Sequence, residues 1–275
     1  MKKIINIVIC YNNPHEVAEY AKKLKELKYS SNITLVVVVN SIDSDQFYVL
    51  EKLKKEQWFE VLIAIPSQNL GYMNGLLFGY KEYKSIHSSV PDLVIMSNTD
   101  IKYDDKLFLE RLMMTQYSDE VYAIGPAVYS QARKSFENPV AYTRRTLSEI
   151  NRLIFILDIP VIRTLYLFAS DVKARIKKTG RGVSDNVYEV HGCYFILKGV
   201  FAELIKEKKY GALMYSEEAF ISEEIYKLGK KEFYDSELYI EHLEHSVTGL
   251  LGAKKIAKYI VESMKVIKKE YYSNE

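Results

Sequence analysis

The sequence has few cysteines and no excess of either charge, and both facts exclude classes of protein. Cys10 and Cys193 are its two cysteines, which excludes a disulfide framework and favours a reducing, cytoplasmic compartment. The 38 Lys and Arg residues balance 36 Asp and Glu residues among 275. A protein that binds nucleic-acid backbones normally shows a basic excess. We therefore expect no nucleic-acid partner.

Long apolar runs are also missing. The run at 4–10 is interrupted by Asn6 and lacks a small-residue cleavage site, so it predicts a first strand rather than a signal peptide. The apolar stretch 153–170 contains an aspartate, a proline and an arginine. It therefore falls short of the roughly 20 apolar residues of a membrane span. We expect a cytoplasmic protein that is at most peripheral to the inner face of a membrane.

The first half of the sequence alternates apolar strands with helical patterns. Strands are predicted at 4–10, 33–39, 61–65, 93–97 and 121–124, and helices at 15–28, 46–55, 72–86 and 104–114. Uninterrupted apolar strands that alternate with helices predict an α/β fold with a parallel sheet covered on both faces. Ligands bind beyond the carboxyl ends of such strands. We expect the polar segments that follow the strands to meet along one rim; they are 11–12, 40–45, 69–74 and 98–100.

The second half is less regular, and 126–187 has few strand signals. A strand interrupted at Gly192 is predicted at 187–197, followed by a helix at 217–230 that ends near Gly229, a strand at 233–243 and a helix at 253–272. The stretch 144–178 is both basic and apolar. It fits a membrane-surface or lipid-acceptor contact, and it also fits a helix pair packed on the core or a dimer interface.

Four places carry residues suited to chemistry. Asp100 follows an apolar strand in Asn-Thr-Asp; its carboxylate suits a hard divalent cation, and the triplet also suits a plain turn. Gly71 precedes a helix whose N-terminus favours an anion, although the Walker A residues are missing. Glu217 and Glu218 open a helix, either as ordinary dipole compensation or as a general base. His242 is either a metal ligand or a structural histidine, with no third nitrogen or sulfur ligand nearby in sequence.

Taken in order, these segments resemble the family 2 glycosyltransferases, above all the bacterial rhamnosyltransferase-like branch that builds cell-surface polysaccharides. The resemblance covers residues 4 to 246. The matching motifs are Val-Ile-Cys-Tyr-Asn at 8–12, Val-Val-Val-Asn-Ser-Ile-Asp-Ser-Asp at 37–45, Asn-Leu-Gly-Tyr at 69–72, Met-Ser-Asn-Thr-Asp at 96–100, Val-His-Gly-Cys-Tyr-Phe-Ile-Leu at 190–197 and Glu-Glu at 217–218.

The resemblance implies a GT-A fold, which is a Rossmann-like, mostly parallel sheet flanked by helices. It also implies a helical acceptor-side insertion and a C-terminal helix. A single domain would span 1–250, with a nucleotide-sugar-binding half at 1–125 and an acceptor-binding half at 126–250. The variable helical region would be 141–182, and a C-terminal amphipathic helix would follow at 251–275.

The implied activity is metal-dependent, inverting transfer of a hexosyl or rhamnosyl group. The donor would be UDP- or dTDP-linked, and the acceptor would be a saccharide or a lipid-linked saccharide in surface polysaccharide synthesis. An oligomer is compatible with this activity. The resemblance implies Mn²⁺ or Mg²⁺ on Asp100 and His242, and Glu218 as the base with Glu217 beside it. The implied donor contacts are Cys10, Tyr11, Asn12, Asn40, Asn69, Gly71, Tyr72, Asn74 and Asn98, and the implied acceptor contacts are His191, Gly192 and Cys193.

The sequence departs from the family pattern at four positions. Asn40 replaces an Asp that accepts a hydrogen bond from the pyrimidine, and Glu218 replaces the catalytic Asp. Phe220 and Glu224 replace an Asp and an Arg of the same helix. These changes leave open a nucleotide-sugar-binding protein that has lost catalysis. A sugar-nucleotide nucleotidyltransferase is a weaker alternative, because residues 11–14 lack the expected Gly-rich loop with Arg and Lys.

Overall fold

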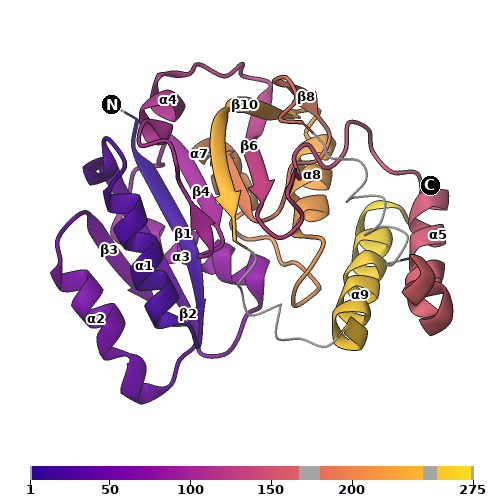
Figure 1. Cartoon of the computed structure of the whole chain (residues 1–275), viewed down its shortest axis with the longest axis horizontal. Coiled ribbons are helices and arrows are strands. Elements are labelled where there is room, and N and C mark those ends of the chain that lie inside the picture. Colours follow the sequence, from indigo (N-terminus) through magenta and orange to yellow (C-terminus); the bar gives the residue numbers. More distant parts are fainter. Residues whose placement is uncertain (1, 167–179, 244–252, 274–275) are drawn as a thin grey trace.

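The computed structural model describes residues 2–166, 180–243 and 253–273, which form an α/β fold: one mixed β-sheet flanked by helices (Figure 1). In the described part of the chain the sheet has the strand order β3-β2-β1-β4-β9-β6-β10-β5, with β7 on β6 and β8 on β10. The strands are β1 (Ile4–Tyr11), β2 (Ile33–Ser41), β3 (Glu60–Ala64), β4 (Leu93–Ser97), β5 (Ile101–Lys102), β6 (Val121–Ser130), β7 (Ser135–Phe136), β8 (Asp185–Val187), β9 (Tyr194–Lys198) and β10 (Lys231–His242). The helices are α1 (Pro14–Lys25), α2 (Tyr48–Lys55), α3 (Tyr72–Ile86), α4 (Phe108–Met114), α5 (Leu147–Asp158), α7 (Gly199–Ile205), α8 (Glu217–Lys227) and α9 (Ala253–Tyr271).

The first four long strands form the parallel sheet that their apolar sequences predict. β1 pairs in parallel with β2 on one side and with β4 on the other, and β2 pairs in parallel with β3. Beyond β4 the sheet becomes mixed, because β9 runs antiparallel to both β4 and β6, while β6 and β10 are parallel. The carboxyl ends of β1, β2 and β4 therefore lie at one edge of the sheet.

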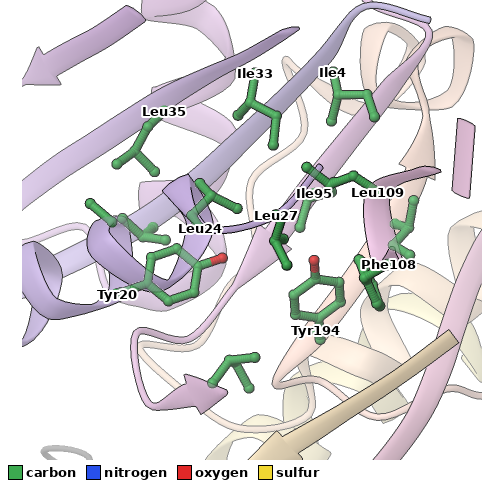
Figure 2. Packing of buried hydrophobic residues seen from close by; sticks show 14 of the residues in the cluster. Ile4, Tyr20, Leu24, Leu27, Ile33, Leu35, Ile95, Phe108, Leu109 and Tyr194 are labelled. Carbon is green, nitrogen blue, oxygen red and sulfur yellow. The ribbon is translucent and has the colours of Figure 1, made fainter. Parts of the chain in front are cut away.

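Helices cover both faces of the sheet. On one face, buried side chains of α1, α2 and α4 pack against the strands; Figure 2 shows Tyr20 and Leu24 of α1, and Leu27 just after it, in the same cluster as Ile33 and Ile95 of the sheet. On the other face α3, α7 and α8 cover the same strands. This two-sided burial explains why the strands are apolar without alternation.

Several predicted boundaries differ from the structure, and one predicted strand is wrong. The predicted helix 104–114 begins at Phe108, and the predicted strand 121–124 continues to Ser130 as β6. The predicted strand 187–197 is two strands, β8 and β9, separated by 188–193. In this interval the backbone N–H groups of Val190 and His191 donate to side chains at 2.9 and 2.6 Å instead of to a neighbouring strand.

The helices α5 and α9 lie side by side at one end of the molecule, away from β3 (Figure 1). α9 also contacts α8, so the predicted C-terminal helix packs against α5 and α8. The basic stretch 144–178 includes the helix α5 at 147–158, which packs against α9. Its residues 167–178 lie outside the described residues. No helix within the described ranges has the length and apolar character needed to cross a membrane.

Candidate active site

A pocket of about 280 Å³ lies at the carboxyl edge of the parallel strands. We call it the rim pocket. The polar segments that follow β1, β2 and β4 contribute to it together with the segment before α3, so the predicted convergence along one rim is confirmed. Its lining residues are Ile9, Tyr11, Asn13, Asn40, Asn69, Gly71, Tyr72, Ser97, Asn98, Thr99, Leu213, Met214, His242, Lys255 and Tyr259.

The wall of the rim pocket before α3 is held by backbone contacts. Gly71 has φ of 76°, and a Cβ there would stand 2.2 Å from the carbonyl oxygen of Leu213, so this position requires glycine. The close backbone contact that Gly71 allows is therefore with Leu213 of the same chain. The N–H of Tyr72 donates to the same carbonyl at 3.0 Å, which removes the first N–H of α3 from anion binding.

Asn40 supports this wall from β2. Its amide nitrogen donates to the carbonyl of Gly71 at 2.7 Å, and its oxygen accepts from the N–H of Leu70 at 3.3 Å. Both ends of the amide therefore position the 69–71 segment. Three other residues with predicted donor contacts do not line the rim pocket: Cys10 is buried in the core, Asn12 is exposed, and Asn74 donates to the carbonyl of Tyr210.

The structure brings Asp100 and His242 together. Asp100 directly precedes β5 and His242 ends β10, and antiparallel pairing of the two strands sets His242 opposite Ile101. Asp100 Oδ1 lies 3.4 Å from His242 Nε2; the Asp100 side chain is buried and that of His242 is 12% exposed. On the other side of the ring, Nδ1 lies 3.6 Å from Oε2 of Glu137.

Glu137 is a site residue that the sequence did not reveal. It lies in the irregular segment after β7, where a single acid carries no recognisable signal. Its Oε2 also lies 3.4 Å from Nε2 of His191. Because His191 Nδ1 accepts the N–H of Cys193 at 3.2 Å, the proton of a neutral His191 ring belongs on Nε2, facing Glu137.

These residues fit a divalent cation as a partial site. Two ligand atoms 3.4 Å apart can share one ion, and neither ring nitrogen of His242 has a hydrogen bond within the described residues. Glu137 stands where a carboxylate would orient a metal-bound imidazole. No group of three or more potential ligands is preassembled among the described residues, so diphosphate oxygens and water would have to complete the coordination.

Glu217 and Glu218 follow two residues in a strained backbone conformation. Tyr215 and Ser216 have φ of 70° and 58°, values that are uncommon for residues other than glycine. The hydroxyl of Ser216 lies 2.9 Å from that of Ser263 on α9. The turn places both carboxylates at the start of α8, where Glu217 is buried and Glu218 is half-buried.

Burial changes the acidity of both groups. Burial, and then the charge of Glu218, raises the pKa of Glu217 to about 8. Burial, and then the charge of Glu189, raises the pKa of Glu218 to about 7, while Arg145 opposes the shift. Arg145 pairs with Glu189 at 2.9 Å. A carboxylate with a pKa near neutrality is suited to accept a proton.

Glu218 lines a second pocket, of about 220 Å³, which we call the helix pocket. Its polar end holds Arg145, Tyr188 and Glu189, and its apolar walls come from α5 and α9. Residues 191 and 192 line neither pocket but lie near one residue of each. The Oε2 of Glu218 would stand 2.8 Å from a Cβ on Gly192, and the neighbouring His191 ring lies 5.9 Å from that of His242. Cys193, the third predicted acceptor contact, is buried in the core.

Glu224, which stands where the family pattern has Arg, has a structural role. Its carboxylate accepts a hydrogen bond from Tyr271 of α9 at 2.8 Å and pairs with Lys208 at 3.1 Å. The adjacent Glu223 is buried and accepts from Tyr272 at 2.6 Å. These contacts fasten the end of α9 to α8, the helix that carries Glu218.

Two solved structures are similar to this chain. The mannosyltransferase PcManGT from Pyrobaculum calidifontis in complex with GDP-Man and Mn²⁺ matches with a TM-score of 0.55 and 10% identity, over 87% of this chain and 56% of that chain. GalNAc-T7 with UDP, GalNAc and Mn²⁺ matches with a TM-score of 0.62 and 11% identity, over 100% of this chain and 49% of that chain. This chain therefore spans about half the length of either protein.

The sequence matches no protein-family model and no curated protein sequence. Membership of family 2 and of its rhamnosyltransferase-like branch therefore stays a prediction. At identities this low, structural similarity shows the fold. The expected fold class is confirmed: the chain has an α/β fold of the GT-A type, with a curled, mostly parallel sheet flanked by helices.

Proposed function

We propose that this chain is a metal-dependent, inverting glycosyltransferase. Its donor is a UDP- or dTDP-linked sugar, and its acceptor is a saccharide or lipid-linked saccharide in bacterial surface polysaccharide synthesis. The observation that carries the proposal is the juxtaposition at Gly192. The Glu218 carboxylate of the helix pocket lies against Gly192, and the ring of the adjacent His191 lies 5.9 Å from that of His242 in the rim pocket. The similar structures with GDP-Man or UDP and Mn²⁺ support this class of donor.

In this proposal the rim pocket binds the donor nucleotide. Tyr11, Asn69 and Asn98 present a ring and two amides there, which suit a base and its sugar. Asp100 and His242 would hold Mn²⁺ or Mg²⁺, which offsets charge on the diphosphate leaving group. Glu137, whose Oε2 lies 3.6 Å from Nδ1, would orient the metal-bound His242 ring.

Glu218 is the general base. Its carboxylate takes the proton from the acceptor hydroxyl while the hydroxyl oxygen forms a bond to the anomeric carbon. The bond from that carbon to the β-phosphate oxygen breaks, and its electron pair leaves with the nucleoside diphosphate. Placing the acceptor in the helix pocket, across Gly192 from the donor, supplies positioning for attack from the opposite face.

The test is a thermal-shift screen of nucleotide sugars with and without Mn²⁺, followed by assays of donor hydrolysis and transfer. We expect stabilisation by one donor and slow hydrolysis of that donor. Glu218→Gln should bind the donor normally and lose transfer. Binding without hydrolysis or transfer by the wild-type protein would instead favour the non-catalytic nucleotide-sugar-binding protein.

A further inference from the structure

The helix α9 contributes a cation to the rim pocket. Lys255 and Tyr259, one helical turn apart, line this pocket together with His242. The Lys255 ammonium lies 5.9 Å from the centroid of the Tyr259 ring. Neither residue belongs to a motif in the sequence, so only the packing of α9 brings them to the strand ends.

Among the described residues, the lining of the rim pocket has one lysine or arginine, Lys255, and no carboxylate, although Asp100 and Glu137 lie behind His242. Two other lysines of α9 are paired: Lys258 with Glu262 at 3.8 Å and Lys265 with Asp158 at 3.5 Å. Within the described ranges, Lys255 makes no such pair, and of the α9 lysines without one it is the one that lines the rim pocket.

The charge of a bound donor would exceed what a metal ion can offset. A divalent ion between Asp100 and His242 would be offset by the Asp100 carboxylate alone, because a metal-bound imidazole is neutral and the charge of Glu137 is paired with Arg133 at 3.2 Å. One of the two negative charges of the donor diphosphate then requires a cation from elsewhere. The nucleoside diphosphate gains a further negative charge when it leaves.

We propose that Lys255 binds the diphosphate of the nucleotide donor and stabilises the leaving group. This rests on the proposed function, since it assigns a residue to the same donor site. Lys255 contributes from the C-terminal helix, and so the donor site is complete only when α9 is packed in place.

Three sets of contacts hold α9 in that position. Its middle is joined to the start of α8 by the hydrogen bond between Ser263 and Ser216, and its end by Tyr271 and Tyr272 on the acids of α8. It also packs along α5. The helix that carries the base thus also positions the helix that carries Lys255.

The test compares Lys255→Ala with Lys254→Ala by calorimetry in the presence of Mn²⁺. Lys254 is the adjacent exposed lysine and does not line the rim pocket, so it is the matched control. The probes are UDP, dTDP and GDP and their nucleosides. Lys255→Ala should weaken binding of the preferred nucleoside diphosphate by about tenfold, as expected for a partly screened contact to a charged group. Binding of the nucleoside should be unchanged.

The remaining results are equally decisive. Lys255→Arg should recover most of the diphosphate affinity, and the affinity of Lys255→Ala should depend less on salt than that of the wild type. Equal affinities of the two alanine variants for the diphosphate would overturn the proposal, as would an equal loss of nucleoside and diphosphate binding by Lys255→Ala. If the wild-type protein binds none of the three diphosphates, the proposed function itself is wrong, and the role of Lys255 fails with it.

Discussion

Gly192→Ala is a test of the geometry between the two pockets. The added Cβ would lie 2.8 Å from Oε2 of Glu218, while the next atom, Cζ of Phe195, is at an ordinary 3.6 Å. The carboxylate oxygen must retreat by about 0.6 Å to reach normal contact. The end of a flexible side chain can move that far, so the free energy of unfolding should change by less than about 1 kcal/mol.

The transfer rate should respond much more strongly than stability. A displacement approaching 1 Å at a reacting group can cost about 100-fold in rate, so we expect kcat to fall by roughly 10- to 100-fold. Donor affinity should be unchanged, because Gly192 does not line the rim pocket. The assay measures kcat for transfer, donor Kd by calorimetry and the melting temperature.

Gly180→Ala is the matched control, because a Cβ at Gly180 would meet no atom of the described residues within 4 Å. It should leave the rate, the donor affinity and the melting temperature unchanged. A folded Gly192→Ala variant that transfers sugar at the wild-type rate would refute the placement of Glu218 as the base.

Three further predictions concern the acids of the site and of the fold. Since burial, and then Glu189, raises the pKa of Glu218 to about 7, the base must lose its proton to act, and the transfer rate should rise through about pH 7; a rate that is flat from pH 5 to 8 would contradict this. Asp100→Ala should abolish the gain in donor affinity that Mn²⁺ provides, and unchanged Mn²⁺-dependent binding by calorimetry would exclude Asp100 as a ligand. Glu223→Ala removes the buried partner of Arg144 and should cost roughly 3–5 kcal/mol of unfolding free energy in a denaturant titration. The exposed pair of Glu19 with Lys22 offers the control, since Glu19→Ala should cost no more than about 1 kcal/mol; an equal loss in both variants would argue against the buried pair.

The parallel half of the fold could be predicted from sequence because its signals are local. Apolar strands and helical periodicity fixed β1 to β4 and the helices between them to within a few residues. The error at 187–197 has the opposite origin. Its apolar residues look like one strand, but the backbone at Val190 and His191 is bonded to side chains far away in sequence, Glu232 and Asn138.

The candidate site divides in the same way. Asn98, Asp100 and Glu218 were recognisable because each follows a strand or opens a helix within a motif. Glu137 and Lys255 were not, since they stand in segments without a pattern and reach the site through packing.

The sequence alone thus specifies a parallel sheet and a polar rim at its carboxyl edge, because strand direction and hydrophobic pattern are local properties. The pairing of His242 with Asp100, the burial that raises the pKa of Glu218 and the approach of Lys255 to the rim pocket all depend on elements distant in the chain. Distances between such groups, and the exclusion of water around them, exist only after the helices pack on the sheet.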